Sequence, residues 1–300
     1  MASAYPARVA AYVSNSGSNT VTVVDTQLER SVETVPVGAG PIGIDAAPDG
    51  EAVYVANERD GTMSVIDTAG HRVTATVLVG RQPFDVEVSP DGNRVYVPVF
   101  GENKLVVVDT ATRRIVARIA LPQLPHSVVA GPNDRVYVSS NGARSVSVVD
   151  ARTLRVVATV PVGVFPAQMA LAADAGRLYV ANTGSDTVTV VDTLTNRPVR
   201  TLPVGDAPRG VALSPDEGRL YVANTGSGTV TVLNTATGRK PATVRVGGDP
   251  TGVAVTPDGS RVYVTNEATG AVTVIDAAAL RVHTTVRTGH RPEAVAVTPR

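Results

Sequence analysis

A tyrosine followed by valine recurs along the whole chain at an almost constant spacing. The pair begins every 42 residues, with one step of 41, at Tyr12, Tyr54, Tyr96, Tyr137, Tyr179, Tyr221 and Tyr263. A fixed period of about 20–50 residues is the sequence mark of a repeat architecture. The chain is therefore built from seven copies of one unit, and its fold must repeat as well.

Each unit carries four strand signals. In residues 250–289, the segments 252–256, 261–265, 271–276 and 282–287 alternate apolar with polar or small residues, which is the period of a β-strand. Pro-Asp-Gly, an Asn-containing loop and an Asp-x-x-x-x-Arg turn separate them. Four strands in about 40–45 residues make one propeller blade. The sequence predicts an all-β, seven-bladed β-propeller of four-stranded antiparallel blades, with residues 1–300 as a single domain.

The two ends of the chain complement each other. Residues 292–299 match the first strand of a unit, whereas the chain begins just before a second strand at 9–13. Ring closure removes open strand edges, which would otherwise pair with other chains. We therefore expect the C-terminal strand to join the N-terminal blade.

The repeat resembles that of the YVTN β-propeller family. The motif stands as Tyr12-Val-Ser-Asn15, Tyr54-Val-Ala-Asn57, Tyr179-Val-Ala-Asn182, Tyr221-Val-Ala-Asn224 and Tyr263-Val-Thr-Asn266. The third and fourth copies lack the asparagine and have Val99 and Ser140 instead. The resemblance implies a seven-bladed ring and says little about activity, because such rings host unrelated functions.

Composition narrows the function classes. The chain has 27 Lys+Arg and 27 Asp+Glu, so it lacks the positive field that nucleic acids and anionic membranes attract. It has no Cys, which excludes thiolate chemistry. No apolar run approaches the length of a membrane span, and residues 1–11 do not read as a secretory signal. We expect a cytoplasmic monomer with a small-molecule ligand and no required cofactor.

The copies differ at one face of the ring. The loop leading into the innermost strand (the inner loop) and the loop between the second and third strands (the middle loop) should share this top face, around the central mouth. After the inner-loop proline come Ile42, Phe84, His126, Ala167, Arg209, Thr251 and Glu293. Phe100 and Phe165, the two other phenylalanines, also fall in top-face loops. Such a mixture of aromatic, histidine and carboxylate groups is typical of a small-molecule pocket.

The leading hypothesis is an enzyme that performs lyase, cyclase or isomerase-type acid/base chemistry at this mouth. Its catalytic groups would be His126, His290, Asp85, Glu87 and Glu293, because histidines and buried carboxylates can transfer protons near neutrality. Its substrate would contact Phe84, Phe100, Phe165, Gln168 and Arg209. Asp45, Asp85 and Glu87 offer the hard oxygen ligands that Mg or Ca prefers, so they form a candidate metal set.

Two other interpretations remain open. The same face could belong to a non-catalytic binding ring for a peptide or protein. A deep cavity with inward-facing histidines would favour the enzyme, whereas a shallow face with exposed phenylalanines would favour a partner surface. Alternatively, the phenylalanines fill gaps between blades, and Asp85 or Glu87 pairs with Arg81 or Arg209.

Overall fold

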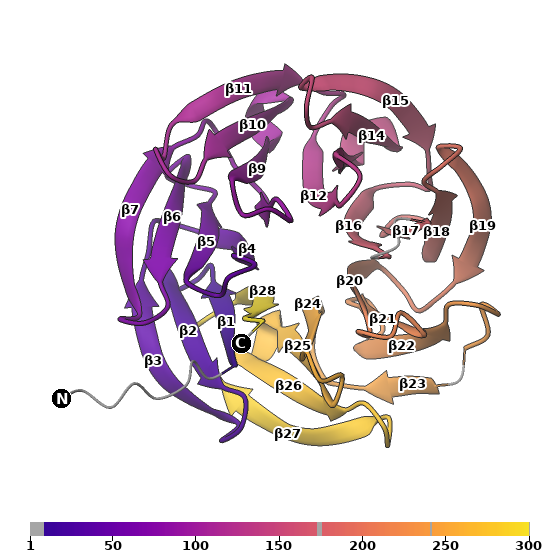
Figure 1. Ribbon diagram of the computed structural model, residues 1–300. Helices are drawn as coiled ribbons and strands as arrows, with labels where there is room; N and C mark the ends of the chain where they lie inside the picture. The colour runs from indigo at the N-terminus through magenta and orange to yellow at the C-terminus, as the bar shows by residue number, and fades with distance from the viewer. Residues whose placement is uncertain (1–8, 173–175, 241, 300) are drawn as a thin grey trace.

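The computed structural model describes residues 9–172, 176–240 and 242–299. Within these residues the strands form seven four-stranded antiparallel sheets, arranged as blades around a central axis (Figure 1). The predicted seven-bladed propeller is confirmed. No helix in the described ranges is long and apolar enough to cross a membrane.

Each blade is counted from the axis outward. The innermost strands are β28 (Pro292–Val297), β4 (Pro41–Ala46), β8 (Glu87–Val88), β12 (Pro125–Gly131), β16 (Pro166–Leu171), β20 (Pro208–Leu213) and β24 (Pro250–Val255). The second strands are β1 (Ala10–Asn15), β5 (Ala52–Asn57), β9 (Arg94–Val99), β13 (Arg135–Ser140), β17 (Arg177–Asn182), β21 (Arg219–Asn224) and β25 (Arg261–Asn266).

The outer half of each blade follows in the same order. The third strands are β2 (Thr20–Asp25), β6 (Thr62–Asp67), β10 (Lys104–Asp109), β14 (Ser145–Asp150), β18 (Thr187–Asp192), β22 (Thr229–Asn234) and β26 (Ala271–Asp276). The peripheral strands are β3 (Arg30–Pro36), β7 (Arg72–Leu78), β11 (Ile115–Ala120), β15 (Arg155–Pro161), β19 (Arg197–Pro203), β23 (Ala242–Arg245) and β27 (Arg281–Arg287). Three middle loops contain short 3₁₀ turns, η1 (Phe100–Glu102), η2 (Asn141–Ala143) and η3 (Glu267–Thr269).

The ring closes within the first blade. Strand β28 pairs antiparallel with β1, and Tyr12 lies opposite Ala296. The first blade therefore takes its inner strand from the C-terminal end of the chain and its other three strands from the N-terminal end. This is the predicted closure, and it leaves the first blade with the same strand order as the others.

The hydrophobic core lies between neighbouring blades. Tyr179 and Val190 of the fifth blade belong to one buried cluster with Leu220 and Val222 of the sixth. A single four-stranded sheet cannot bury both of its faces. The repeated tyrosine is buried for this reason: it fills the space between a blade and the next one.

The motif asparagine ties the top of each regular blade together. In the fifth blade, Asn182 Nδ2 donates to the hydroxyls of Thr187 (3.2 Å) and Thr189 (2.9 Å). Its Oδ1 accepts from the backbone N–H of Gly163 (3.0 Å) in the inner loop. In the seventh blade, where position 271 is alanine, Asn266 still donates to the hydroxyl seven residues further on, Thr273 (2.7 Å). The third blade has Val99 and Val106 at these two positions and has lost the arrangement.

The inner and middle loops lie on the same face, as predicted. In all seven blades, a middle-loop N–H bonds the carbonyl of the residue before the inner-loop proline, for example Asn141 to Leu124 (2.8 Å). A left-handed backbone conformation accompanies this contact in every blade. The seven residues are Gly40, Gln82, Leu124, Phe165, Ala207, Asp249 and Arg291, with φ between 50° and 64°.

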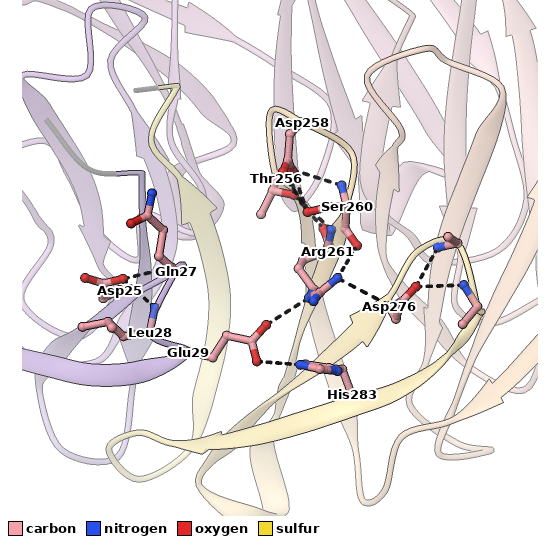
Figure 2. A network of polar contacts seen from close by, with 12 residues as sticks. Asp25, Gln27, Leu28, Glu29, Thr256, Asp258, Ser260, Arg261, Asp276 and His283 are labelled. Carbon is pink, nitrogen blue, oxygen red and sulfur yellow. Dashed lines mark hydrogen bonds and ion pairs between the residues drawn. The ribbon is translucent and has the colours of Figure 1, made fainter. Parts of the chain in front are cut away.

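The opposite face is held by the repeated aspartate turn (Figure 2). Asp25 Oδ1 accepts from the N–H groups of Gln27 (2.9 Å) and Leu28 (2.8 Å), as expected for a short carboxylate in a turn. In the same region Glu29 bridges to the seventh blade, where it meets Arg261 (2.9 Å) and His283 (3.0 Å). This face is therefore built as scaffold.

Candidate functional site

A β-bulge opens the inner strand of most blades at the mouth. In the second, fourth, fifth, sixth and seventh blades, the strand register shifts just after the inner-loop proline. A bulge re-aims the side chains beside it. Six predicted site residues consequently line one cavity at the mouth: Phe84, Asp85, His126, Gln168, Arg209 and Glu293.

This cavity is small. Its volume is about 30 Å³, where one water molecule needs about 10–15 Å³ of such space. Pockets that enclose a small organic ligand have about 300–1,000 Å³. The mouth therefore admits water and closes the channel to a metabolite.

Aromatic rings make up one side of the mouth. The rings of Phe84 and His126 lie 4.2 Å apart between centroids, at 40° to each other. Phe84 also packs against Phe100, with 5.5 Å between ring centroids. Phe100 begins η1, next to the position where the motif asparagine is replaced by Val99. Two of the three predicted apolar residues are therefore adjacent, and both are half-buried.

His126 is held in its neutral form. Its Nδ1 atom is buried and has no hydrogen-bond partner within the part of the chain that the structure describes. Burial, with the charge of Arg209 as a smaller contribution, lowers the pKa of the imidazole to about 3. A group with this pKa gains a proton only in strong acid, so the environment disfavours the proton-transfer role predicted for His126.

A His126→Gln variant should gain stability relative to the wild type as the pH falls from 6.5 toward 4. The unfolded chain binds a proton at His126 below about pH 6.5, whereas the folded chain does so only near its lowered pKa of about 3. The wild type therefore loses stability over this range through linkage, by about 3 kcal/mol. Urea unfolding of both proteins at pH 7 and pH 4.5 measures the difference, and parallel curves would contradict it.

A proline explains why the inner strand of the third blade is short. Pro98 O accepts from the N–H of Phe84 (3.0 Å), so this edge of Pro98 faces the inner strand. Proline has no N–H to donate on that edge, which removes one hydrogen bond from the ladder. The ladder between β8 and β9 is limited to Glu87 and Val88. Asp85 is left outside the ladder, next to the channel.

Three carboxylates reconnect the inner strands around this gap. Asp45 accepts from the N–H of Val88 (2.8 Å), Asp85 from that of Val128 (3.2 Å), and Glu87 from that of Ala130 (3.1 Å). Each bond crosses from one blade to the next. These side chains act as ties between blades, which is a structural role that the sequence interpretation did not include.

Enclosure in the channel wall makes these carboxylates hard to ionise. Burial raises the pKa of Asp45 to about 7, against the smaller opposing effect of backbone hydrogen bonds. Burial also raises the pKa of Asp85 to about 6, against smaller opposing effects of the Ser127 hydroxyl and of backbone hydrogen bonds. Burial raises the pKa of Glu87 well above its usual value, and the charge of Asp45 adds to this. The three groups therefore share fewer than three negative charges at neutral pH.

The carboxylates do not fit the metal site proposed from the sequence. An oxygen of Asp45, Asp85 and Glu87 is in each case bonded to a backbone amide of the adjacent blade. Among the described residues, no three Asp, Glu or His side chains converge so that they could hold a metal ion.

Charged groups make up the other side of the mouth. Arg209 lies 3.7 Å from Glu267, which also accepts from Arg291 (2.5 Å). Arg209 thus pairs with Glu267 and not with Asp85 or Glu87. Glu293 accepts from the Ser16 hydroxyl (2.9 Å), and burial, with the charge of Glu267, raises its pKa.

Five of the predicted residues do not line the mouth cavity: Asp45, Glu87, Phe100, Phe165 and His290. Of these, His290 is exposed in its inner loop, and Phe165 is 53% exposed in the inner loop of the fifth blade. One useful residue was missed. Glu267 was missed because it is the first residue of a middle loop. Comparison of that position across the copies would have marked Glu267 and Glu58 as the two charged residues in it.

Comparison with known families agrees with this architecture. The sequence profile of a family described as "YNCE-like beta-propeller" matches residues 2–87, which is consistent with the resemblance to YVTN-type propellers. Comparison with curated proteins gives no significant match.

Solved propellers superpose on most of the chain. Hydrazine synthase of Kuenenia stuttgartiensis aligns with a TM-score of 0.79 and 22% identity, over 87% of this chain and 90% of its own. A functionally unknown protein from Desulfotomaculum acetoxidans gives 0.81 and 15%, over 96% and 98%. Dihydro-heme d1 dehydrogenase NirN in complex with DHE gives 0.70 and 19%, over 93% and 63%. At these identities the likeness shows the fold alone.

Proposed function

We propose that the protein is a non-catalytic binding propeller, which holds a peptide segment of a partner protein on its top face. The volume of the mouth carries this proposal, since about 30 Å³ admits water and no metabolite. Any larger ligand must therefore be bound on the surface of the ring. The side chains that face outward there decide what that ligand is.

Apolar side chains follow one another along three adjacent blades. We call Phe84, Phe100, Leu124 and Phe165 the apolar arc. Leu124 is 36% exposed and Phe165 is 53% exposed, in a left-handed loop position that other blades fill with Gly, Gln, Ala, Asp or Arg. Bulky side chains are rare in this conformation. Exposed apolar groups that gather on one face are typical of a protein-binding surface.

Polar groups continue the ring opposite the apolar arc. Arg209, Glu267, Arg291 and Glu293 form a connected set of ion pairs and close charges on the sixth, seventh and first blades. Protein interfaces commonly combine an apolar centre with a polar rim. The top face offers both, so it suits a peptide that carries apolar anchors.

The acid/base hypothesis receives less support from the same geometry. His126 is neutral and its Nδ1 is enclosed, and the carboxylates Asp85 and Glu87 are engaged by amides of the fourth blade. A general base must come within hydrogen-bond reach of the proton that it removes. A metabolite outside the closed mouth would not bring its proton within reach of these groups.

Replacing Leu124 and Phe165 together by Asn should remove peptide binding. Asn tolerates the left-handed conformation, so the variant keeps the loops. Wild-type protein is used to select peptides from a random dodecapeptide library displayed on phage, and selected peptides are then measured on the variant. Loss of two buried apolar contacts should weaken binding at least about tenfold.

Leu194→Asn is the matched control. Leu194 is 82% exposed in a turn of the opposite face, so its replacement removes a similar apolar side chain away from the arc. Selected peptides should bind this control as they bind the wild type. Peptides that bind the Leu124/Phe165 variant equally well would refute the proposal, as would a library that yields no binders.

A further inference from the structure

We infer that a groove on the top face, between the second and third blades, binds an acidic stretch of the partner peptide. The groove has a volume of about 940 Å³. Its lining includes Glu58, Leu78, Arg81, Glu102, Lys104 and Arg118. The inference rests on the proposed function and adds to it the charge of the partner.

Two basic residues of this groove break the internal repeat. Arg118 occupies a position that is threonine in all six other copies: Thr34, Thr76, Thr159, Thr201, Thr243 and Thr285. Lys104 occupies a position where the others have a small residue: Thr20, Thr62, Ser145, Thr187, Thr229 and Ala271. Since the blade forms without these charges six times, the fold alone does not require them.

The loss of a hydroxyl group in the third blade accompanies the change at position 118. In the seventh blade, the Thr273 hydroxyl donates to the carbonyl of Val246 in the preceding blade (3.2 Å). Val106 stands at the same position in the third blade, and Arg118 Nη1 donates to the carbonyl of Val79 instead (2.9 Å). Arg118 therefore replaces a hydroxyl contact between the blades, and its carbonyl partner leaves the guanidinium charge within electrostatic reach of Glu102.

The other cations of the groove are also held in place with their charge available. Arg81 donates through Nε (3.2 Å) and Nη2 (2.5 Å) to the carbonyl of Gly101. Lys104 lies 3.6 Å from Glu102, and its side chain is 41% exposed. With Arg59, four cations line the groove against three carboxylates, Glu58, Asp60 and Glu102, so one positive charge is in excess. Exposed pairs such as that of Lys104 with Glu102 contribute little by themselves, so an incoming carboxylate can compete for the cations.

The groove favours an acidic peptide over other anions. Leu78 is 70% exposed at its wall, where it offers an apolar contact that an inorganic ion cannot use. Glu58 and Glu102 would repel a dense polyanion such as a nucleic acid, which agrees with the zero net charge of the chain. A peptide with spaced carboxylates and apolar side chains matches both features.

The test uses a fluorescein-labelled dodecapeptide in which Glu and Leu residues alternate with Gly. A matched peptide has Gln in place of Glu. Fluorescence anisotropy at low salt gives the affinity of each peptide for the wild type and for Lys104→Thr/Arg118→Thr, which restores the repeat. Loss of two ionic contacts should weaken binding of the acidic peptide about tenfold, and the Gln peptide should bind weakly to both proteins.

Two further variants make the outcome unambiguous. Lys240→Thr/Arg245→Thr removes the same charge at exposed positions elsewhere and should bind like the wild type. Leu78→Glu adds a repelling charge to the groove at an exposed site and should weaken binding even if the first variant proves unstable.

Equal affinity of the wild type and both groove variants would overturn the inference. Equal competition by citrate, at the same carboxylate concentration, would also overturn it in favour of a small anion. A failure of the proposed function is distinguished from a failure of this inference by a different result. It would appear as unchanged binding of phage-selected peptides to the Leu124/Phe165 variant, because the groove of that variant is intact.

Discussion

A chain that lacks residues 290–299 should lose the cooperative thermal unfolding of the full ring. Strand β28 supplies the inner strand of the first blade, and its residues Ala294, Val295 and Ala296 are buried. Deletion exposes the edge of β1 and the apolar faces beside it. We expect a loss on the order of 5 kcal/mol, which is comparable to the whole stability of many domains.

Differential scanning calorimetry of the full and shortened chains measures this effect. A synthetic peptide of residues 288–299 should raise the melting temperature of the shortened chain, because it can pair with β1 in the same register. A scrambled peptide of the same composition is the control and should have no effect. A shortened chain that melts like the full one would show that the ring does not depend on this closure.

Asp45→Asn should become more stable relative to the wild type as the pH rises from 4.5 to 8. The folded-state pKa of Asp45 is about 7, above its ordinary value of about 4 in an unfolded chain. Asp45 therefore contributes its full stabilisation to the wild type below about pH 4, and this contribution is lost as the pH rises through 7. The expected gain of the variant over this range is on the order of 3 kcal/mol.

The variant leaves the tie between blades in place. Asn keeps a carbonyl oxygen, which can still accept from the N–H of Val88. The loss of the Asp45 charge also lowers the pKa of Glu87, since that charge contributes to its elevation. Urea unfolding at several pH values tests this, with Asp49→Asn in an exposed turn as the control. An Asp45 variant that follows the wild type at every pH would show that the carboxylate ionises freely.

The fold was predictable because every copy meets the same physical demand. Each blade must bury two faces, so Tyr12 and its six equivalents recur at one position, and a regular blade needs the asparagine that Asn182 represents. The position of each residue within its repeat also predicted that Phe84, His126, Arg209 and Glu293 share the central mouth, and all four line its cavity. These features depend on residues within one unit or on its symmetric contacts.

The remaining features depend on contacts that the repeat does not encode. The tie from Asp85 to Val128 exists because Pro98 interrupts a ladder that other blades complete. The neutral state of His126 follows from enclosure by Phe84 and its neighbours, which periodicity cannot measure. Arg118 was visible as a departure from threonine, but only packing of the third blade against the second brings it beside Arg81.

The paired loops of the top face join neighbouring blades into a continuous recognition surface. One N–H···O=C bond and one left-handed residue before proline hold the two loops of every blade. In three blades the middle loop also reaches the next blade, because the side chains of Asn141, Thr183 and Thr225 donate to the carbonyl of the following inner-loop proline. An exchange of loops should therefore preserve the ring and move the specificity when the loops of adjacent blades are moved together. A library that varies neighbouring loops as a set could turn the protein into a binder whose contact surface is adjusted blade by blade.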